Sequence, residues 1–445
     1  MTTSFPEQLW KHISQARWFA GKGRGARPLA LHHLDWFVRR EDLAVRASVA
    51  EIGFPDGSRE RYQILLSHRA ERGEGFLHTT APEDDAGVVG GVAAELPHVH
   101  DALKDPEALR ALVVRLGSPA ETPTWTTTVV RPVDLSGDVK VFGGEQSNTS
   151  VMVGDVAMVK FFRRLEPGAN LDIAVHDALA RAGVGSVATL YGWASGTLEG
   201  EQMDLAMLVE QLPGAHDGWD VATRAAASGE DFTSAAADLG RALAEIHRAL
   251  SDTFPTTVLP SEELSGIMVN RLEAAAREAS ALEPLVPALA ERFRRLAGQK
   301  VGAQRVHGDF HLGQTLLTDE GWRIIDFEGE PLKTLTERSE PDSRWRDVAG
   351  MLRSLAYATS ACDDPRGEQA RAWQQATQRA FLDAYLGQSS TRHLGPEDRA
   401  LLDAYVADKA IYEVVYENRN RPTWVDIPLQ ALRSLVADNN EENRT

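Results

Sequence analysis

VHGDFHLGQTLLTDEGWRIIDFEGEP, residues 306–331, is the stretch of this 445-residue chain that decides its predicted fold. An H-G-D triplet comes first, and an amide, Gln314, follows five residues after its aspartate. Two short apolar runs, 314–317 and 322–326, are joined by the turn residues T-D-E-G, which is the pattern of a β-hairpin. The stretch therefore predicts a polar loop, a hairpin, and a carboxylate where the second strand ends.

The residue types in this stretch suit the transfer of a phosphoryl group to a hydroxyl. Protein kinases place an aspartate, an amide five residues later and a strand-end aspartate in this order. Asp309 is the candidate base that accepts the proton of the attacking hydroxyl. Mg²⁺ prefers oxygen ligands, and Asp326, Gln314 and Glu328 supply them. We therefore predict ATP and Mg²⁺ as cofactors.

The same stretch has two other possible interpretations. One is a surface hairpin with scattered acids, which leaves the ordered match to a kinase loop unexplained. The other is a zinc site at His307, Asp309 and His311, but no cysteine accompanies these residues and a kinase loop accounts for them. In the kinase interpretation His307 supports the loop and His311 lies with the phosphoryl acceptor.

Composition limits the class of protein. The chain is 43% apolar, enough for sizeable cores, and its net charge of −18 argues against nucleic acid or an anionic membrane as partner. A single cysteine, Cys362, excludes an intrachain disulfide and suits a reducing cytoplasm. The N-terminus has no pattern of a signal peptide, and no apolar run is long enough to span a bilayer. We therefore expect a cytoplasmic protein.

The pattern along the chain predicts an α+β protein with two kinase-like lobes and an extra N-terminal cap. Residues 1–100 hold alternating strand patterns and an initial amphipathic helix, a region that protein kinases lack. The predicted parts are a cap subdomain over 1–100, a connecting helix and linker over 101–133, a nucleotide-binding lobe over 134–212, and a helical catalytic and acceptor-binding lobe over 213–445.

The nucleotide-binding lobe contains a polar turn, G-G-E-Q-S-N-T-S, at 143–150, where kinases fold a glycine-rich loop over the ATP phosphates. Its backbone N–H groups and the hydroxyls of Ser147 and Thr149 are candidate phosphate donors. Lys160 ends the strand that follows and matches the kinase lysine that pairs with the α- and β-phosphates. The buried-type strand 205–211 predicts the hinge, with the backbone from Glu210 to Leu212 bonding adenine.

A second informative stretch, DKAIYEVVYENRNRPTW, lies at 408–424. Lys409, Tyr412 and Tyr416 are three and four residues apart and share one face of a helix. Glu413 lies beside them, so the group is a candidate sugar site in which tyrosines stack on sugar rings. The alternative is a stripe of core tyrosines. Asp347, near the start of another helix, is expected to accept hydrogen bonds from the catalytic-loop backbone, or alternatively to interact only with its own helix dipole.

The motifs H-G-D-F-H-L-G-Q, I-D-F-E-G-E-P and P-D-S-R-W-R-D-V-A-G-M-L-R-S resemble those of the actinobacterial maltokinases, and A-R-W-F-A-G-K-G-R resembles their N-terminal cap. The resemblance implies an ATP-dependent kinase that converts maltose to maltose 1-phosphate for glycogen and α-glucan synthesis. It also implies a monomer, with trehalose synthase as a candidate associate. The pattern departs at Ala174, where the family has an acid, so the partner of Lys160 stays open.

Two alternatives to a maltokinase remain. The related actinobacterial glucosamine kinases share much of the pattern, but they carry a tryptophan near position 416, so Tyr416 favours maltose. Another small-molecule kinase of the aminoglycoside phosphotransferase type is also compatible with the motifs. A catalytically dead nucleotide-binding regulator is disfavoured because Asp309, Gln314 and Asp326 are all present.

Overall fold

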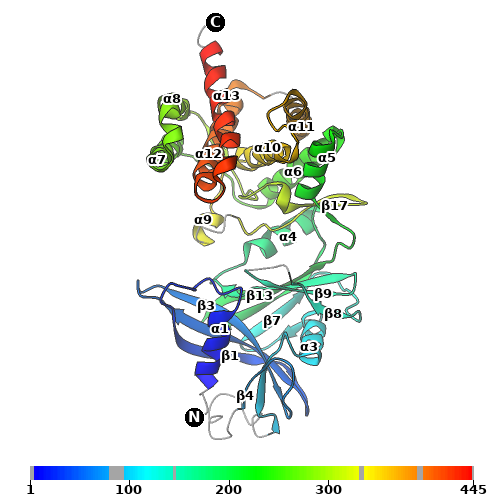
Figure 1. Cartoon of the computed structure of the whole chain (residues 1–445). Coiled ribbons are helices and arrows are strands. Elements are labelled where there is room, and N and C mark those ends of the chain that lie inside the picture. The colour runs from blue at the N-terminus through cyan, green and yellow to red at the C-terminus, as the bar shows by residue number, and fades with distance from the viewer. Residues whose placement is uncertain (1–4, 80–94, 144–146, 330–334, 388–393, 443–445) are drawn as a thin grey trace. The chain divides into compact units, whose positions relative to one another are not determined.

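The computed structural model describes residues 5–79, 95–143, 147–329, 335–387 and 394–442 (Figure 1). The chain divides into two compact units. The first comprises Met1–Asp177 and Ala188–Pro213, and the second comprises Ala178–Val187 and Gly214–Thr445. The division falls within one helix, α4 (Leu171–Ala182).

The first unit contains two mainly antiparallel sheets and the helices α1 (Phe5–Gln15) and α3 (Pro106–Leu116). In the cap sheet the order is β1-β2-β3-β5-β4, with β11 added on β3; its strands are β1 (Arg27–Arg39), β2 (Ala44–Gly53), β3 (Arg59–Arg69), β4 (Phe76–Thr79), β5 (His98–Asp101) and β11 (Arg164–Leu165). The strand patterns predicted in the cap region correspond to β1, β2 and β3.

The second sheet has the order β6-β7-β12-β13-β10-β9-β8. Its strands are β6 (Ala120–Glu121), β7 (Trp125–Val129), β8 (Val139–Val141), β9 (Thr149–Val153), β10 (Ala157–Phe161), β12 (Leu190–Leu198) and β13 (Glu201–Glu210). Successive side chains of a strand point to opposite faces. On one face of β2, the side chains of Val45, Ala47 and Val49 belong to a hydrophobic core formed together with the second sheet. On the other face, Ala50 and Ile52 belong to a core formed together with α1. Both faces of β2 are therefore covered, which explains its almost complete burial.

The cap sheet and the second sheet are joined by hydrogen bonds within this unit. β11 pairs with β3 directly after β10 ends. The buried side chain of Gln63 donates from Nε2 to the carbonyl oxygens of Phe162 and Leu205, each at 2.8 Å. A buried amide that satisfies two strand carbonyls fixes the register between the sheets.

The half-buried His33 and the buried His68 of the cap predict a loss of stability in mild acid. Burial, with a smaller contribution from Arg46, lowers the pKa of His33 and of His68 to about 3. Since the folded state holds both rings neutral, stability is complete above the ordinary value of 6.5 and is lost as the pH falls toward 3. Each histidine loses roughly 1.4 kcal/mol per pH unit, so the pair loses about 4 kcal/mol between pH 6.5 and pH 5.

Denaturant titrations at pH 7.5 and pH 5 measure this loss. We expect His68→Gln to reduce the difference in unfolding free energy between the two pH values by about 2 kcal/mol, the share of one histidine. His216→Asn removes an exposed histidine and should leave the difference unchanged. Equal pH dependence in the His68 variant and the wild type would contradict this assignment.

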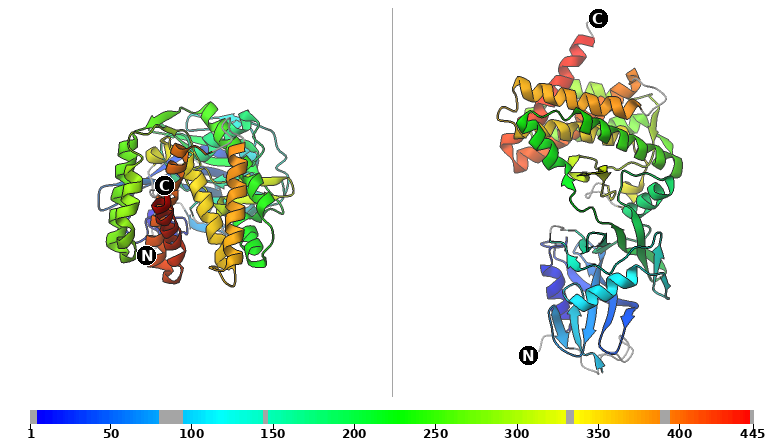
Figure 2. Two further views of the ribbon diagram at one scale, coloured as in Figure 1. Left: turned by 90° about the horizontal axis from the view of Figure 1, so that it is seen from above. Right: turned by 90° about the vertical axis from the view of Figure 1, so that its right-hand side faces the viewer.

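The second unit is mostly helical. The helices α6 (Thr233–Thr253) and α11 (Glu368–Gly387) run side by side, as the green and orange helices of Figure 2 show. The remaining helices are α5 (Gly218–Ser228), α7 (Ser261–Glu278), α8 (Val286–Arg294), α9 (Leu335–Ser339), α10 (Trp345–Ala358), α12 (Pro396–Asn420) and α13 (Asp426–Glu442). α10 packs on α12, and its residues Val348, Met351 and Leu355 have no exposed surface.

A three-stranded sheet, β14-β17-β18, interrupts these helices. Its strands are β14 (His216–Asp217), β17 (Thr315–Thr318) and β18 (Gly321–Ile324), and a separate pair consists of β15 (Thr257–Leu259) and β16 (Val301–Ala303). β17 and β18 form the hairpin that the sequence predicts. Among the helices that the structure describes, none combines the length and apolar character needed to cross a membrane.

Candidate active site

The loop that contains Asp309 is anchored by a buried carboxylate. Asp347, on α10, is fully buried and accepts hydrogen bonds from the backbone N–H of His307 (2.7 Å) and of Gly308 (2.9 Å). His247 contacts the same carboxylate through Nε2 at 2.9 Å and reaches the Tyr385 hydroxyl through Nδ1. Burial would raise the pKa of Asp347, but the His247 and loop hydrogen bonds outweigh it and lower the pKa. The expected bonds from the catalytic-loop backbone to Asp347 are present.

His307 links this loop to the end of strand β18. Its Nε2 lies 3.0 Å from the carbonyl oxygen of Ile325, so Nε2 carries the proton and donates. Nδ1 is then an acceptor, and the backbone N–H of Asp309 lies 3.4 Å from it. Because Ile325 precedes Asp326, His307 connects the candidate base to the candidate metal ligand.

Two glycines allow this packing. Gly308 has φ = +87°, a conformation that side chains rarely adopt, and its carbonyl accepts from Arg346 Nε at 2.9 Å. On α10, a Cβ at Gly350 would lie 2.4 Å from the carbonyl oxygen of Phe310. The helix can therefore approach the loop closely enough for Asp347 and Arg346 to hold it.

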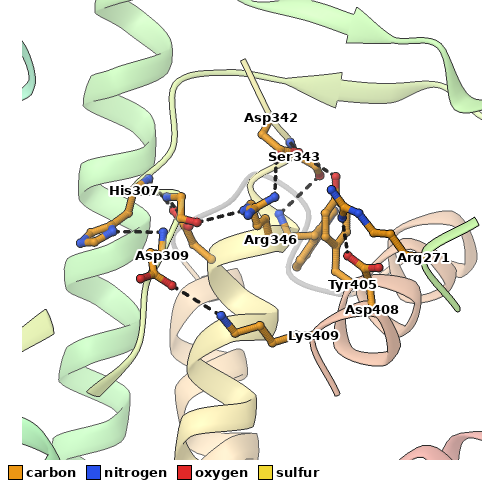
Figure 3. Close-up of polar contacts among 12 residues, drawn as sticks. Arg271, His307, Asp309, Asp342, Ser343, Arg346, Tyr405, Asp408 and Lys409 are labelled. Carbon is orange, nitrogen blue, oxygen red and sulfur yellow. Dashed lines mark hydrogen bonds and ion pairs between the residues drawn. The ribbon is translucent and has the colours of Figure 1, made fainter. Parts of the chain in front are cut away.

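Asp309 carries a partner on each carboxylate oxygen. Lys409, on α12, places Nζ 3.4 Å from Oδ1 (Figure 3). His311 places Nε2 4.0 Å from Oδ2. The other nitrogen of His311, Nδ1, accepts from the Gly313 backbone at 3.1 Å, so His311 also caps the turn that follows the loop. Burial lowers the pKa of His311, and Asp309 only partly opposes this effect.

The candidate metal ligands of the second unit lie together. The Gln314 amide nitrogen is 3.5 Å from Asp326 Oδ2, and carboxylate oxygens of Asp326 and Glu328 are within 4.8 Å of each other. Asp326 has φ = +66°, in the left-handed region that few residues except glycine, asparagine and aspartate adopt. Such strain concentrates at functional sites. A donor set of two carboxylates and an amide fits Mg²⁺, with the amide oxygen as ligand.

A cavity of about 490 Å³ lies beside Asp309. This volume is within the range of small-molecule sites, about 300–1,000 Å³. Its walls come from α7, the catalytic loop, α9, α10 and α12, and its polar lining comprises Arg271, Glu278, Asp309, Glu337, Arg346, Tyr405, Asp408, Lys409 and Tyr412. Asp309, the candidate base, therefore lines a polar cavity within the second unit.

The strand-end lysine of the first unit has a buried partner. Lys160 Nζ lies 3.1 Å from Oδ2 of Asp172, in the first turn of α4. His176, one turn later, lies 3.2 Å from Oδ1 of the same carboxylate. Burial would raise the pKa of Asp172, but Lys160 and His176 lower it well below its usual range. The acid expected at position 174 is thus supplied from position 172.

This lysine–acid pair and the Asp309 loop both lie within residues 138–388, which match the model of the phosphotransferase enzyme family. The chain belongs to that family. The model of the maltokinase N-terminal cap domain matches residues 12–105. The chain is therefore a phosphotransferase with a cap of the maltokinase type, on a kinase-like α+β fold.

Curated relatives support the family. A glucosamine kinase of Streptacidiphilus jiangxiensis is 31% identical over 322 residues, which cover 66% of this chain and 72% of that protein. A glucosamine kinase of Mycolicibacterium smegmatis is 30% identical over 313 residues, covering 66% and 78%. A solved glucosamine kinase in complex with glucosamine, ADP and inorganic phosphate has a TM-score of 0.72 at 25% identity, covering 98% of this chain and all of that chain.

In this phosphotransferase, one predicted phosphate-binding side chain points away from Lys160. The register pairs Lys160 with Ser150 and Phe161 with Thr149, and opposite residues share a face of the sheet. Thr149 Oγ1 accepts from Nε of the buried Arg163 at 2.8 Å. The hydroxyl of Thr149 is therefore already bonded by Arg163, and its phosphate role stays a prediction. Ser147 is exposed, whereas residues 144–146 of the same turn lie outside the described part.

The predicted hinge has one backbone donor available. The N–H groups of Glu210 and Gln211 bond the carbonyls of Thr189 and Val156, at 2.9 and 3.0 Å. The Glu210 carboxylate accepts from the Thr189 backbone and hydroxyl. Within the described residues no carbonyl accepts from Leu212, so Leu212 is the donor of this segment that adenine can use.

The structure brings two of the four residues predicted to bind the acceptor on α12 to the cavity. Lys409 and Tyr412 line the cavity, and Tyr412 is exposed, which argues against a core stripe. Tyr416 lies seven residues beyond Lys409, about 10 Å further along the helix, and is not among the lining residues. Glu413 turns toward α10 and binds the buried Arg353 at 2.7 and 2.9 Å. Tyr416 and Glu413 therefore do not line this cavity, and their sugar contacts stay predictions.

Several residues of the cavity wall were not predicted from the sequence, among them Asp408 and Arg271. Asp408 directly precedes Lys409, and Arg271 on α7 donates from Nη1 to Asp408 Oδ2 at 2.9 Å. Asp408 could have been found from its position one turn before Tyr412. No feature of the sequence indicates Arg271, because only the packing of α7 on α12 brings it there.

Proposed function

We propose that this phosphotransferase transfers the γ-phosphate of ATP to a hydroxyl of a neutral sugar, with maltose as acceptor and maltose 1-phosphate as product. The cavity beside Asp309 is the observation that carries this proposal. Asp309 accepts the proton of the sugar hydroxyl as it attacks. Lys409 holds the Asp309 carboxylate toward the cavity wall, so the base is oriented before the sugar arrives.

The donor-side residues have defined tasks in this proposal. Lys160, fixed by Asp172, binds the α- and β-phosphates, and the Leu212 N–H bonds adenine. Gln314, Asp326 and Glu328 hold Mg²⁺. The ion, when bound, neutralises charge on the phosphates.

The pairing of charges favours a neutral acceptor over an amino sugar. Four carboxylates line the cavity, those of Glu278, Asp309, Glu337 and Asp408. Asp309 contacts Lys409, Asp408 contacts Arg271, and Glu278 contacts Arg419. An ammonium group gains less from a carboxylate whose charge is already opposed by a cation. The cap of the maltokinase type supports the same acceptor. Glucosamine is the second candidate, because the curated relatives are glucosamine kinases.

An ADP-release assay with purified protein, ATP and Mg²⁺ tests the proposal. Maltose, glucose, glucosamine and an aminoglycoside are offered separately. We expect maltose to give the highest kcat/KM. A preference for glucosamine would replace the proposed acceptor and leave the phosphotransferase assignment intact.

Tyr412→Ala is expected to raise the KM for maltose with little change in the KM for ATP. Tyr412 lines the cavity and offers an exposed ring on which a sugar can stack. Loss of a contact made equally in ground and transition states acts on KM rather than kcat. Loss of the ring and its hydroxyl should cost about 1–3 kcal/mol, roughly 5- to 150-fold.

Tyr416→Ala is the matched control, since Tyr416 is an exposed tyrosine on the same helix that does not line the cavity. Steady-state kinetics with maltose compare the two variants. A larger effect at Tyr416 than at Tyr412 would contradict the position of the acceptor.

A further inference from the structure

We propose that Arg271 is an acceptor-binding and specificity-determining residue of this phosphotransferase: its guanidinium donates to hydroxyls of the sugar and disfavours amino sugars. The inference rests on the proposed function. Arg271 lies on α7, whereas the other residues assigned to the acceptor lie on the catalytic loop and α12. α7 therefore becomes a functional wall of the cavity.

The position of Arg271 combines a fixed guanidinium with open surface. Its Nη1 donates to Asp408 Oδ2 at 2.9 Å, yet the side chain is 50% exposed and lines the cavity (Figure 3). Within the part of the chain that the structure describes, Nε and Nη2 of Arg271 have no hydrogen-bond partner. A guanidinium held at one nitrogen keeps its other N–H groups available in a rigid, planar arrangement.

Asp408 is unusual in a way that supports this role. It is a largely buried carboxylate whose Oδ1 lacks a hydrogen-bond partner among the described residues, and Arg271 is the partner of Oδ2. Burial raises the pKa of Asp408, and the nearby Arg271 and Arg346 only partly oppose this. A buried acid with so few partners destabilises a fold, and such groups persist chiefly at functional sites. We infer that Asp408 is retained to position Arg271.

The charges around Arg271 define the class of ligand. The cavity is lined by Arg271, Arg346 and Lys409 and by the carboxylates of Glu278, Asp309, Glu337 and Asp408, so the effect of charge depends on which side chain a ligand group adjoins. A hydroxyl beside Arg271 accepts hydrogen bonds from the guanidinium, whereas an ammonium at the same place cannot accept and is repelled by it. An acceptor that places a hydroxyl beside Arg271 should therefore bind better than its amino analogue.

The test compares Arg271→Met with Arg277→Met, which makes the same change at an exposed arginine of the same helix that does not line the cavity. With maltose, we expect Arg271→Met to raise KM by about 10- to 100-fold and to leave the KM for ATP unchanged. The ratio of kcat/KM for glucosamine to that for maltose should rise at least about tenfold, because the repelling charge is gone. Arg277→Met should match the wild type in both quantities.

Arg271→Lys separates charge from geometry. It retains the positive charge but loses the planar set of donors, so KM for maltose should rise while discrimination against glucosamine persists. Thermal unfolding of each variant checks the fold, and the exposed position of Arg271 favours folded variants. Suppose that the wild type phosphorylates maltose but Arg271→Met changes neither the KM for maltose nor the ratio of kcat/KM for glucosamine to that for maltose. This result would overturn the role of Arg271 and leave the proposed function intact. A wild type that phosphorylates no sugar would overturn the proposed function instead.

Discussion

Asp309→Asn should lower turnover by about 10²- to 10⁴-fold while ATP still binds. The substitution preserves the shape of the side chain and an oxygen for Lys409, which lies 3.4 Å from Oδ1. It removes the group that accepts the proton of the attacking hydroxyl, and a positioned base contributes an effect of this size. Single-turnover phosphorylation of maltose measures the chemical step, and fluorescence titration with a nucleotide analogue measures binding.

The control for this variant is Asp319→Asn. Asp319 is an exposed acid in the turn of the same β-hairpin, far along the strand from the loop, and its removal should have no effect on turnover. The loop itself should remain in place in Asp309→Asn, because Asp347 and Arg346 hold the backbone of His307 and Gly308. Turnover within a few-fold of the wild type would eliminate Asp309 as the base.

Asp326→Asn should weaken the binding of Mg²⁺-ATP itself. Magnesium would lose a charged ligand, and the loss should exceed the roughly 10- to 100-fold effect that follows removal of an outer partner of a metal site. Asparagine is the suitable replacement because Asp326 has φ = +66°, which asparagine tolerates and alanine does not. Calorimetric titration with ATP in the presence and absence of Mg²⁺ gives the metal-dependent part of the affinity.

The two substitutions have opposite signatures. Asp309→Asn acts on the chemical step and spares binding, whereas Asp326→Asn acts on binding that depends on the metal. ATP affinity without Mg²⁺ should be the same in Asp326→Asn and in the wild type. Unchanged Mg²⁺-ATP affinity in this variant would show that the carboxylate is not a metal ligand.

Local patterns were sufficient to predict the catalytic hairpin and its loop. The apolar runs around the T-D-E-G turn became β17 and β18, and the H-G-D triplet lies where Asp347 can anchor it. The hairpin depends on residues close to one another in the sequence. The loop is recognisable because phosphoryl transfer requires Asp309, Gln314 and Asp326 in this order and spacing. The cap strands β1 to β3 were predicted for the same reason, since alternation along a strand reflects its two faces.

Other parts of the site depend on packing that no local pattern contains. The partner of Lys160 is Asp172 rather than a residue at position 174, because the start of α4 decides which side chain reaches the lysine. The register of β9 against β10 decides that Ser150, and not Thr149, lies on the same face of the sheet as Lys160. Arg271 belongs to the site solely because α7 packs against α12.

The central claim is that this phosphotransferase phosphorylates a neutral sugar with Asp309 as the base. Phosphorus NMR of a reaction that contains wild-type protein, ATP, Mg²⁺ and maltose tests it most directly. We predict a new phosphate monoester coupled to the anomeric proton of the sugar, formed in proportion to ADP and formed at least about 100-fold more slowly with Asp309→Asn. ADP formation without any sugar phosphate, or a sugar phosphate from glucosamine but none from maltose, would contradict the account.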